Sequence, residues 1–248
     1  MSEDEFIYGR NALKELLERS PETVAKIYVK TGIRGDSVDA IFNLSSAHKI
    51  PLQQVPGKKL NDLVGAVNDQ GVVAQVSSRS YLELDEWLEV VNMQENPFVL
   101  MLDEIEDPHN FGAILRTAAA CGVAGVIVPK HRQAPVNATV YKTSAGAADL
   151  VNLIRVVNLN QTILKMKEAG FWICGLDQNA KTVYWQQKFD MPVALVVGSE
   201  GRGIRKKTLE HCDFTVSIPM KKGVESLNAS VSTALICYEV ERQRESSD

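Results

Sequence analysis

The sequence predicts an α/β protein with two domains, the second of which contains a parallel β-sheet. Three features lead to this prediction: short strand and helix patterns alternate in the first part, a polar acidic segment follows, and from Phe98 near-continuous apolar runs alternate with helical stretches. Such apolar runs are typical of strands that helices cover on both faces. The predicted ranges are 1–76 for the first domain, 77–97 for a linker and 98–248 for the second domain.

The first domain is predicted to be a small α/β unit. Apolar residues recur at helical spacing over 11–19, 38–47 and 59–64, and strand patterns occupy 25–30, 51–55 and 71–76. The linker contains a short amphipathic helix over 82–91 and ends in a turn at Asn96-Pro97. We therefore expect the polypeptide to pass from one folded unit to another in this region.

The second domain is predicted to alternate strands with helices. The strands are expected over 98–102, 125–128, 171–176, 193–198 and 214–219, and the helices over 112–120, 159–169, 203–211 and 228–244. In open parallel sheets, ligands bind in loops beyond the carboxyl ends of the strands. We therefore expect the functional residues to lie in the loops that follow these strands.

Composition narrows the class of protein. The chain has 248 residues, 45% of them hydrophobic and 23% charged, which is an ordinary globular composition. No apolar stretch approaches the roughly 20 residues of a membrane helix, and the acidic N-terminus is unlike a secretory signal. We expect a cytoplasmic protein that does not enter a membrane. The cysteines and histidines are scattered without metal-ligand spacing, so we expect no structural metal.

The first loop of interest, residues 103–119, directly follows the first strand of the second domain. Pro108 and Gly112 are predicted to fix a tight loop, so that Asn110 lies near the start of the next helix and Arg116 in its second turn. An arginine in an apolar helix is costly unless its guanidinium reaches a partner or a cleft. The alternative is a surface arginine whose apolar stem lies along the helix.

The second loop, VVGSEGRGI over residues 196–204, carries several glycines after a buried strand. Glycines let the backbone approach a ligand closely and expose free N–H groups. The spacing matches neither a dinucleotide-binding fingerprint nor a P-loop. Glu200 would repel phosphates, so a cationic or neutral ligand is expected. The alternative is an ordinary glycine-rich turn.

The third loop, IPMKKGVESLNA over residues 218–229, leads into the last helix. Either Ser226 or Asn228 is suited to capping that helix. In the functional interpretation, Ser226, Leu227 and Asn228 lie beside the glycine-rich loop. A basic cluster between residues 202 and 222 could neutralise phosphates, although it could also be a solvated surface. Its members are Arg202, Arg205, Lys206, Lys207, Lys221 and Lys222.

Taken in order, these motifs resemble those of a known enzyme family. NxGAILRTAxAxG, LVVGSEGRGI and IPMKKGVESLNASVSTALICYE are similar to the three motifs of the SpoU/TrmH group of RNA ribose 2′-O-methyltransferases, and the resemblance extends from Phe98 to the C-terminus. FIYGRNALKELL and the unit behind it are similar to the N-terminal RNA-binding domain of one subgroup. That subgroup methylates a guanosine in the peptidyl-transferase region of 23S ribosomal RNA.

The resemblance implies a fold, a cofactor and a set of functional residues. It implies a trefoil knot in the parallel-sheet domain, a homodimer, and S-adenosyl-L-methionine held in the knot near the subunit interface. The partner would be 23S ribosomal RNA or a large-subunit precursor. Matched by motif position, the catalytic residues would be Asn110, Arg116, Glu200, Ser226 and Asn228. The cofactor-binding residues would be Gly198, Gly201, Ile218, Met220 and Leu227.

Three questions stay open at the level of sequence. The substrate could instead be transfer RNA or another ribosomal position, although a separate N-terminal domain favours ribosomal RNA. A non-catalytic RNA-binding protein is disfavoured because the motif residues are all present, and an oxidoreductase is disfavoured by the glycine spacing. Arg116 could act as a general base, but a guanidinium is almost always protonated. We prefer a role in which it clamps the adjacent phosphate and stabilises the developing alkoxide.

Overall fold

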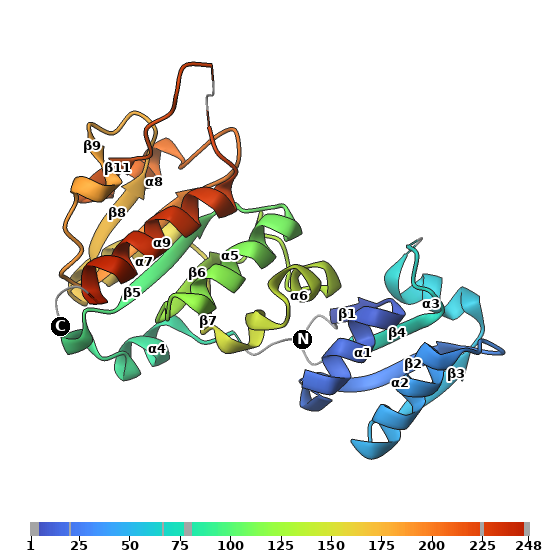
Figure 1. Ribbon diagram of the computed structural model, residues 1–248. Coiled ribbons are helices and arrows are strands. Elements are labelled where there is room, and N and C mark those ends of the chain that lie inside the picture. The colour runs from blue at the N-terminus through green and yellow to red at the C-terminus, as the bar shows by residue number, and fades with distance from the viewer. Residues whose placement is uncertain (1–4, 20, 66, 77–80, 224–225, 246–248) are drawn as a thin grey trace. The chain divides into compact units, whose positions relative to one another are not determined.

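The computed structural model describes residues 5–19, 21–65, 67–76, 81–223 and 226–245, which form two compact units. Unit 1 comprises residues 1–80 and 136–149, and unit 2 comprises residues 81–135 and 150–248. Each unit has its own β-sheet and its own hydrophobic core (Figure 1). The short segment 136–149 is thus counted with unit 1, although the sequence places it inside the second domain.

Unit 1 is built on a four-stranded mixed sheet of order β1-β4-β2-β3. Strand β4 runs antiparallel to both β1 and β2, and β2 pairs in parallel with β3. The strands are β1 (Glu5–Tyr8), β2 (Val24–Lys30), β3 (Leu52–Val55) and β4 (Val72–Val76). The helices are α1 (Arg10–Arg19), α2 (Asp36–Ala47), α3 (Gly57–Val64) and α6 (Ala138–Ser144), with a 3-10 turn, η1 (Pro21–Thr23).

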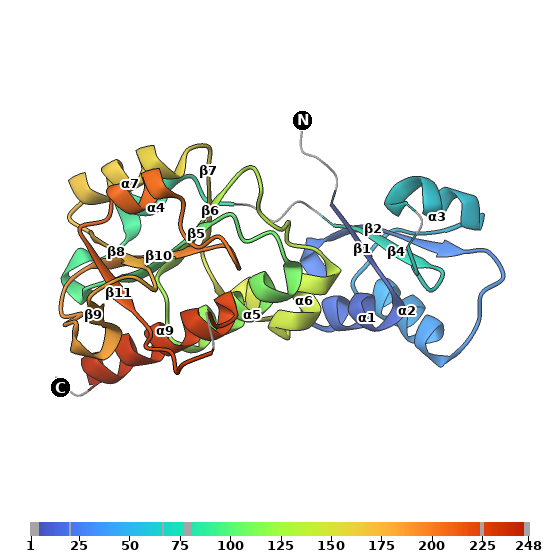
Figure 2. The same cartoon turned by 90° about the horizontal axis from the view of Figure 1, so that it is seen from above.

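Alternation along β4 explains how unit 1 is layered. Val72, Ala74 and Val76 lie in the core that includes residues of α1 and α2, whereas Val73 packs with Leu60 of α3 in a smaller cluster. Successive side chains of a strand point to opposite faces of the sheet. The sheet of unit 1 therefore has α1 and α2 on one face and α3 on the other, as Figure 2 shows.

Unit 2 is built on a seven-stranded sheet of order β7-β6-β5-β10-β8-β11-β9, and all of its described pairings are parallel. This confirms the predicted parallel sheet. The strands are β5 (Phe98–Asp103), β6 (Gly125–Pro129), β7 (Leu153–Val156), β8 (Trp172–Leu176), β9 (Thr182–Val183), β10 (Val193–Gly198) and β11 (Phe214–Ser217). The trefoil knot stays a prediction.

Helices cover both faces of this sheet, because its central strands are apolar on both sides. Every residue of β5 is buried, and α4 and α7 lie on one face while α5 and α9 lie on the other (Figure 2). The helices are α4 (Leu84–Val90), α5 (Pro108–Ala120), α7 (Leu159–Glu168), α8 (Lys206–Glu210) and α9 (Ala229–Glu245). The 3-10 turns are η2 (Met93–Glu95) and η4 (Tyr184–Gln186), while η3 (Ala147–Leu150) spans the boundary between the residue ranges of the two units.

The segment that the sequence describes as a linker contributes to the core of unit 2. Leu84 and Trp87 of α4 are buried in the cluster that contains residues of β5 and α7, and the Trp87 indole donates to the carbonyl of Ala124 at 3.3 Å. Residues 77–80 of the predicted linker lie outside the described residues. Residues 81–97 of the predicted linker are therefore part of unit 2.

Two helix boundaries differ from those predicted. The helix predicted to start at Gly112 begins at Pro108, because the Asp107 carboxylate accepts the N–H of His109 and proline suits the first helical position. Arg116 consequently lies in the third turn and not the second. The helix predicted over 203–211 is the short α8, since Gly201 and Gly203 have φ of 84° and 67°, outside the helical region.

Candidate active site

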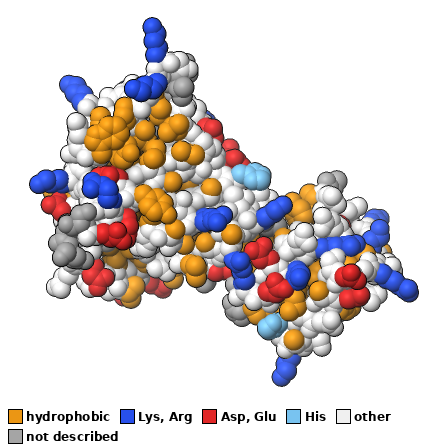
Figure 3. Space-filling model, in the orientation of Figure 1, with side chains coloured by type: hydrophobic (Ala, Val, Ile, Leu, Met, Phe, Trp, Pro, Cys, Tyr) orange, Lys and Arg blue, Asp and Glu red, His pale blue; other side chains and the backbone are white. Residues whose placement is uncertain are grey.

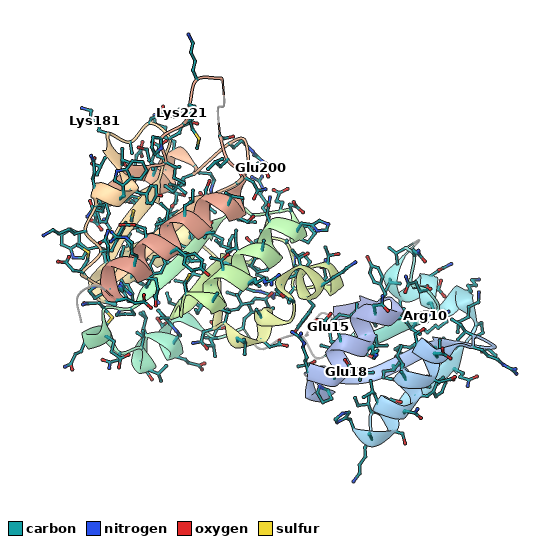
Figure 4. All side chains as sticks on the ribbon, in the orientation of Figure 1. Arg10, Glu15, Glu18, Lys181, Glu200 and Lys221 are labelled. Atoms are coloured by element: carbon teal, nitrogen blue, oxygen red, sulfur yellow. The ribbon has the colours of Figure 1, made fainter. Side chains whose placement is uncertain are left out.

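Side chains from the three loops meet at the carboxyl end of the unit 2 sheet. The Asn110 side-chain amide donates to Glu200 Oε2 at 2.9 Å, and the Asn228 amide donates to Asn110 Oδ1 at 2.6 Å and to Glu200 Oε2 at 3.4 Å. We call these three residues the Asn–Glu–Asn cluster. Figure 4 labels Glu200, which lies near the starts of α5 and α9. One residue comes from each predicted motif, so the three motifs form a single site.

Helix capping helps to position the cluster. Asn228 is the cap of α9: its Oδ1 accepts the backbone N–H of Ser230 at 2.9 Å and the Ser230 hydroxyl at 2.6 Å. This confirms the predicted cap and leaves the Asn228 Nδ2 to bond the cluster. Asn110 is buried in the first turn of α5. The starts of two packed helices therefore position the carboxylate of Glu200.

Close backbone packing explains the glycine at the end of β10. A Cβ atom at Gly198 would overlap the backbone of Gly203 and Ile204, because the chain turns back there and Gly203 N–H donates to the Ser199 carbonyl at 2.8 Å. We call residues 198–204 the glycine loop. Only glycine fits at its first position, so the tight shape of this loop depends on that residue.

A cleft of about 920 Å³ lies beside the glycine loop, and we call it the glycine-loop cleft. Its volume is within the range of small-molecule sites. Glu200 and Ser226 of the predicted catalytic residues line the cleft. All of the predicted cofactor residues line it as well, namely Gly198, Gly201, Ile218, Met220 and Leu227. Their placement agrees with the motif assignment, while their functional roles stay predictions.

The wall of the cleft combines apolar side chains with charged side chains of both signs. Val197, Ile204 and Leu227 offer an apolar surface, the carboxylates of Asp177 and Glu200 also line the cleft, and so do basic residues such as Arg202, Arg205 and Lys206. Within the described residues, no group of three or more His, Cys, Asp and Glu could hold a metal ion. The cleft can therefore offer a ligand apolar contacts and partners for either charge.

Arg116 is placed apart from the cluster. It is exposed on α5, and six residues of helix separate it from Asn110 by roughly 9 Å of rise and about 120° of rotation. None of the described contacts joins it to Asn110, Glu200 or Asn228. The structure of a single chain therefore brings together three of the predicted catalytic residues, places Ser226 at the cleft, and leaves Arg116 on an outer face.

Four charged residues that the sequence analysis did not assign to the site also line or support the cleft. Arg205 donates to the buried carboxylate of Asp103 through its backbone N–H at 3.0 Å and its Nε at 2.8 Å. Glu104 accepts from Arg205 Nη1 at 3.1 Å and from Arg132 Nη1 at 3.4 Å. We call these residues the charge chain. Two acids directly after an apolar strand were the available signal in the sequence.

The thiols of Cys174 and Cys212 are unsuited to act as nucleophiles. Burial raises the pKa of Cys212 to about 12 and that of Cys174 further above its ordinary value. Both therefore remain neutral at physiological pH, where a thiolate would be required for attack or metal binding.

Among the described helices, none is sufficiently long and apolar to cross a membrane.

Comparisons with known proteins agree with the geometry. Residues 97–238 match the model of the SpoU rRNA Methylase family, and residues 6–82 match that of RNA 2′-O ribose methyltransferase substrate binding. Over 241 residues the chain is 42% identical to the 23S rRNA (guanosine-2′-O-)-methyltransferase RlmB of Vibrio parahaemolyticus, covering 97% of this chain and 98% of that protein.

Two solved structures show the same fold. The SpoU methyltransferase AviRb from Streptomyces viridochromogenes, in complex with AdoMet, has a TM-score of 0.78 and 25% identity, covering 98% of this chain and 91% of that chain. The A. aeolicus TrmH/SpoU tRNA modifying enzyme has a TM-score of 0.57 and 31% identity, covering 66% of this chain and 83% of that chain.

Proposed function

The chain belongs to the SpoU rRNA methylase family, and from this we propose that it transfers the methyl group of S-adenosyl-L-methionine to the ribose 2′-hydroxyl of a guanosine in 23S ribosomal RNA. The observation that carries the proposal is the Asn–Glu–Asn cluster, which joins the three family motifs beside a cleft of suitable size. The likeness to RlmB over almost the whole chain supports ribosomal RNA as the substrate. The tRNA modifying structure matches a smaller share of the chain.

The glycine-loop cleft fits the cofactor. Gly198 and Gly201 would allow the backbone to approach it, and Ile218 and Leu227 would offer apolar surface to its adenine ring. Met220 lines the same cleft, and Glu200 places a carboxylate where a sulfonium would be stabilised. When bound, the cofactor supplies a methyl group that its positive sulfur has already activated.

The residues of the chain must then hold the ribose oxygen in line and help it lose its proton. Oε2 of Glu200 receives the amide hydrogens of Asn110 and Asn228, which fixes the carboxylate plane. In this proposal, its Oε1 would accept a hydrogen bond from the 2′-hydroxyl. Ser226, at the edge of the cleft, would add a hydroxyl near the same oxygen.

Arg116 lies away from the cluster in its own chain. We propose that it reaches an active site because two chains pair as a homodimer. Val231 and Tyr238 of α9 are 48% and 56% exposed, and they lie on one side of the helix, seven residues apart. Figure 3 shows hydrophobic side chains on the face of unit 2 where α9 lies. Arg116 occupies the outer side of α5, which packs against α9. Pairing through these helices would carry each Arg116 to the site of the partner subunit, where it would clamp a phosphate.

Basic residues of both units would bind the RNA. Arg202 and Lys206 line the glycine-loop cleft, and Lys221 precedes the last helix at the same end of unit 2 (Figure 4). In unit 1, a hollow of about 1150 Å³ is lined by Arg10, Lys30 and Lys58. Lysine and arginine side chains bind RNA by replacing counterions on its phosphates.

We propose that the methyl transfer takes place in the cytoplasm.

A direct test uses the purified chain with methyl-labelled cofactor and separate samples of 23S ribosomal RNA and transfer RNA that lack ribose methylation. We expect label in the 23S ribosomal RNA at a guanosine 2′-oxygen. Label in transfer RNA alone would support a different member of the family, and label on a base would contradict ribose methylation.

A further inference from the structure

We propose that the charge chain of Asp103, Arg205, Glu104 and Arg132 is the positioning device of the glycine-loop cleft. In this proposal, the chain holds the glycine loop in the shape that binds the cofactor, without itself taking part in methyl transfer. The inference rests on the proposed placement of the cofactor in this cleft.

Both ends of the glycine loop are attached to one residue. Gly198 pairs with Asp103 in the parallel register of β10 and β5, so the loop begins beside Asp103. Arg205, directly after the loop, bonds the same aspartate through its backbone N–H and its Nε, and its Nη2 lies 2.7 Å from Oδ1. The loop is therefore closed by contacts to both oxygens of Asp103: two guanidinium nitrogens converge on Oδ1 and the backbone N–H bonds Oδ2. Lysine cannot reproduce the two guanidinium contacts.

The burial of Asp103 separates this pair from ordinary surface ion pairs. The Asp103 side chain is fully buried, whereas both partners of the Lys165–Asp85 pair are largely exposed. An ion pair with a buried partner carries a desolvation cost that a pair of apolar side chains would avoid. Its presence at the end of β5 is thus better explained by the precise position it imposes on the loop than by its contribution to stability.

Both residues in the other half of the charge chain have a positive φ. Glu104 and Arg132 have φ of 66° and 56°, in the left-handed region that favours glycine, and both line the glycine-loop cleft. Strained residues of this kind persist where the surrounding structure holds them and are common at binding sites. The Glu104 carboxylate is nearly buried and joins Arg205 to Arg132. Glu104 thereby links the residue that follows the glycine loop to Arg132, another residue of the cleft lining.

The test measures the dissociation constant for S-adenosyl-L-methionine by calorimetry on the full chain, together with the single-turnover rate at saturating cofactor. We expect Arg205→Gln to raise the dissociation constant at least about tenfold, Arg205→Lys to raise it less, and Glu104→Gln to raise it several-fold. Because Glu200 lies in the same loop, the single-turnover rate at saturating cofactor should also fall, but by a smaller factor than the affinity. Lys165→Gln, which breaks the exposed surface pair, is the matched control and should change neither quantity.

A second variant guards against a loss of folding. Arg205→Gln leaves a buried carboxylate without its partner, so Asp103→Asn with Arg205→Gln removes both charges at once. Thermal unfolding without cofactor identifies the variants that fold. Wild-type dissociation constants in folded Arg205 and Glu104 variants would overturn the proposal.

Gly198→Ala distinguishes the failure of this proposal from the failure of the proposed cofactor site. If Gly198→Ala abolishes cofactor binding while the charge-chain variants bind normally, the positioning role alone is wrong. If Gly198→Ala also binds normally, the cofactor does not occupy this cleft, and the positioning role falls with it.

Discussion

At the residue scale, Asn228 shows how one side chain joins structure to function. Its oxygen caps α9, and its nitrogen bonds Asn110 and Glu200. The sequence analysis treated a helix cap and a site residue as alternative roles for Asn228. The structure shows that the cap and the cluster contact use different atoms of the same amide, so each contact can be removed separately.

Replacing Asn228 by serine should separate the two contacts. Asn228→Ser keeps a capping oxygen but loses the donor to the cluster, so we expect nearly unchanged stability and a large fall in methyl transfer. Asn228→Ala loses both and should also cost about 1 kcal/mol of unfolding free energy. Thermal unfolding and single-turnover kinetics measure the two effects. Equal activity of Asn228→Ser and the wild type would remove the cluster from the mechanism.

Arg116 is the residue for which the sequence was least informative. Its motif position predicted a place in the catalytic site, but the helix begins four residues earlier than expected, and the side chain lies on the outer side of α5. The charge chain was missed for a related reason. The meeting of Arg205 with Asp103 depends on which loops lie together, and spacing along one sequence does not record that.

At the scale of elements, the predictions succeeded where apolar patterns are long and failed at edges. The buried strands β5, β6, β8, β10 and β11 were predicted because their apolar runs are continuous. Strands β1, β7 and β9 and helix α6 were missed. Strand β7 is short and carries Arg155, and β9 has only two residues. Sheet edges need fewer apolar residues, so their sequence signal is weak.

Helix α9 contains a local ion pair that should make stability depend on pH. The Arg242 guanidinium, bonded to both oxygens of Glu239, holds the pKa of that carboxyl below its ordinary value, and Gln243 adds a further hydrogen bond. A carboxyl whose pKa is lowered by folding stabilises the folded state above its unfolded pKa. That stabilisation is lost as the pH falls through the folded value.

Glu239→Gln should therefore lower the melting temperature at pH 7 and reduce its further fall on acidification. Melting temperatures measured from pH 7 to pH 2.5 test this expectation, with Glu210→Gln on α8 as an exposed control. If the melting temperature of the variant falls with acidification as steeply as that of the wild type, Glu239 does not contribute to the pH dependence of stability.

At the scale of the whole molecule, the proposal requires two units that bind RNA and two chains that share a site. The family models divide the chain in agreement with this requirement, with a substrate-binding match over 6–82 and a methylase match over 97–238. The net charge of −4 gave no sign of an RNA partner. Only the local concentration of basic residues near the cleft did so, because phosphate binding depends on local and not on total charge.

The basic residues near the cleft should set the salt dependence of RNA binding. Neutralising Lys206, Lys207, Lys221 and Lys222 removes contacts to phosphates, each of which contributes about 0.7 to 0.9 to the slope of log affinity against log salt. We expect a weaker and flatter salt dependence for a 23S ribosomal RNA fragment, while Lys165→Gln should leave it unchanged. An unaltered slope in the fourfold variant would place the RNA elsewhere.

Mixed dimers test whether Arg116 acts across the subunit interface. Arg116→Ala alone should abolish methylation but retain cofactor binding. Mixed with Asn228→Ala chains, it should recover about a quarter of wild-type activity, because half of the dimers are mixed and each has one complete site. Absence of recovery in verified mixed dimers would mean that Arg116 acts within its own chain.

The central claim, methylation of a guanosine ribose in 23S ribosomal RNA, is tested most directly by mapping 2′-O-methyl groups in RNA from cells with and without this protein. The account predicts that one guanosine of 23S ribosomal RNA loses its ribose methyl group without the protein. Wild-type protein should restore that group, and Glu200→Gln should not. An unchanged 23S ribosomal RNA, with the loss found in transfer RNA, would contradict it.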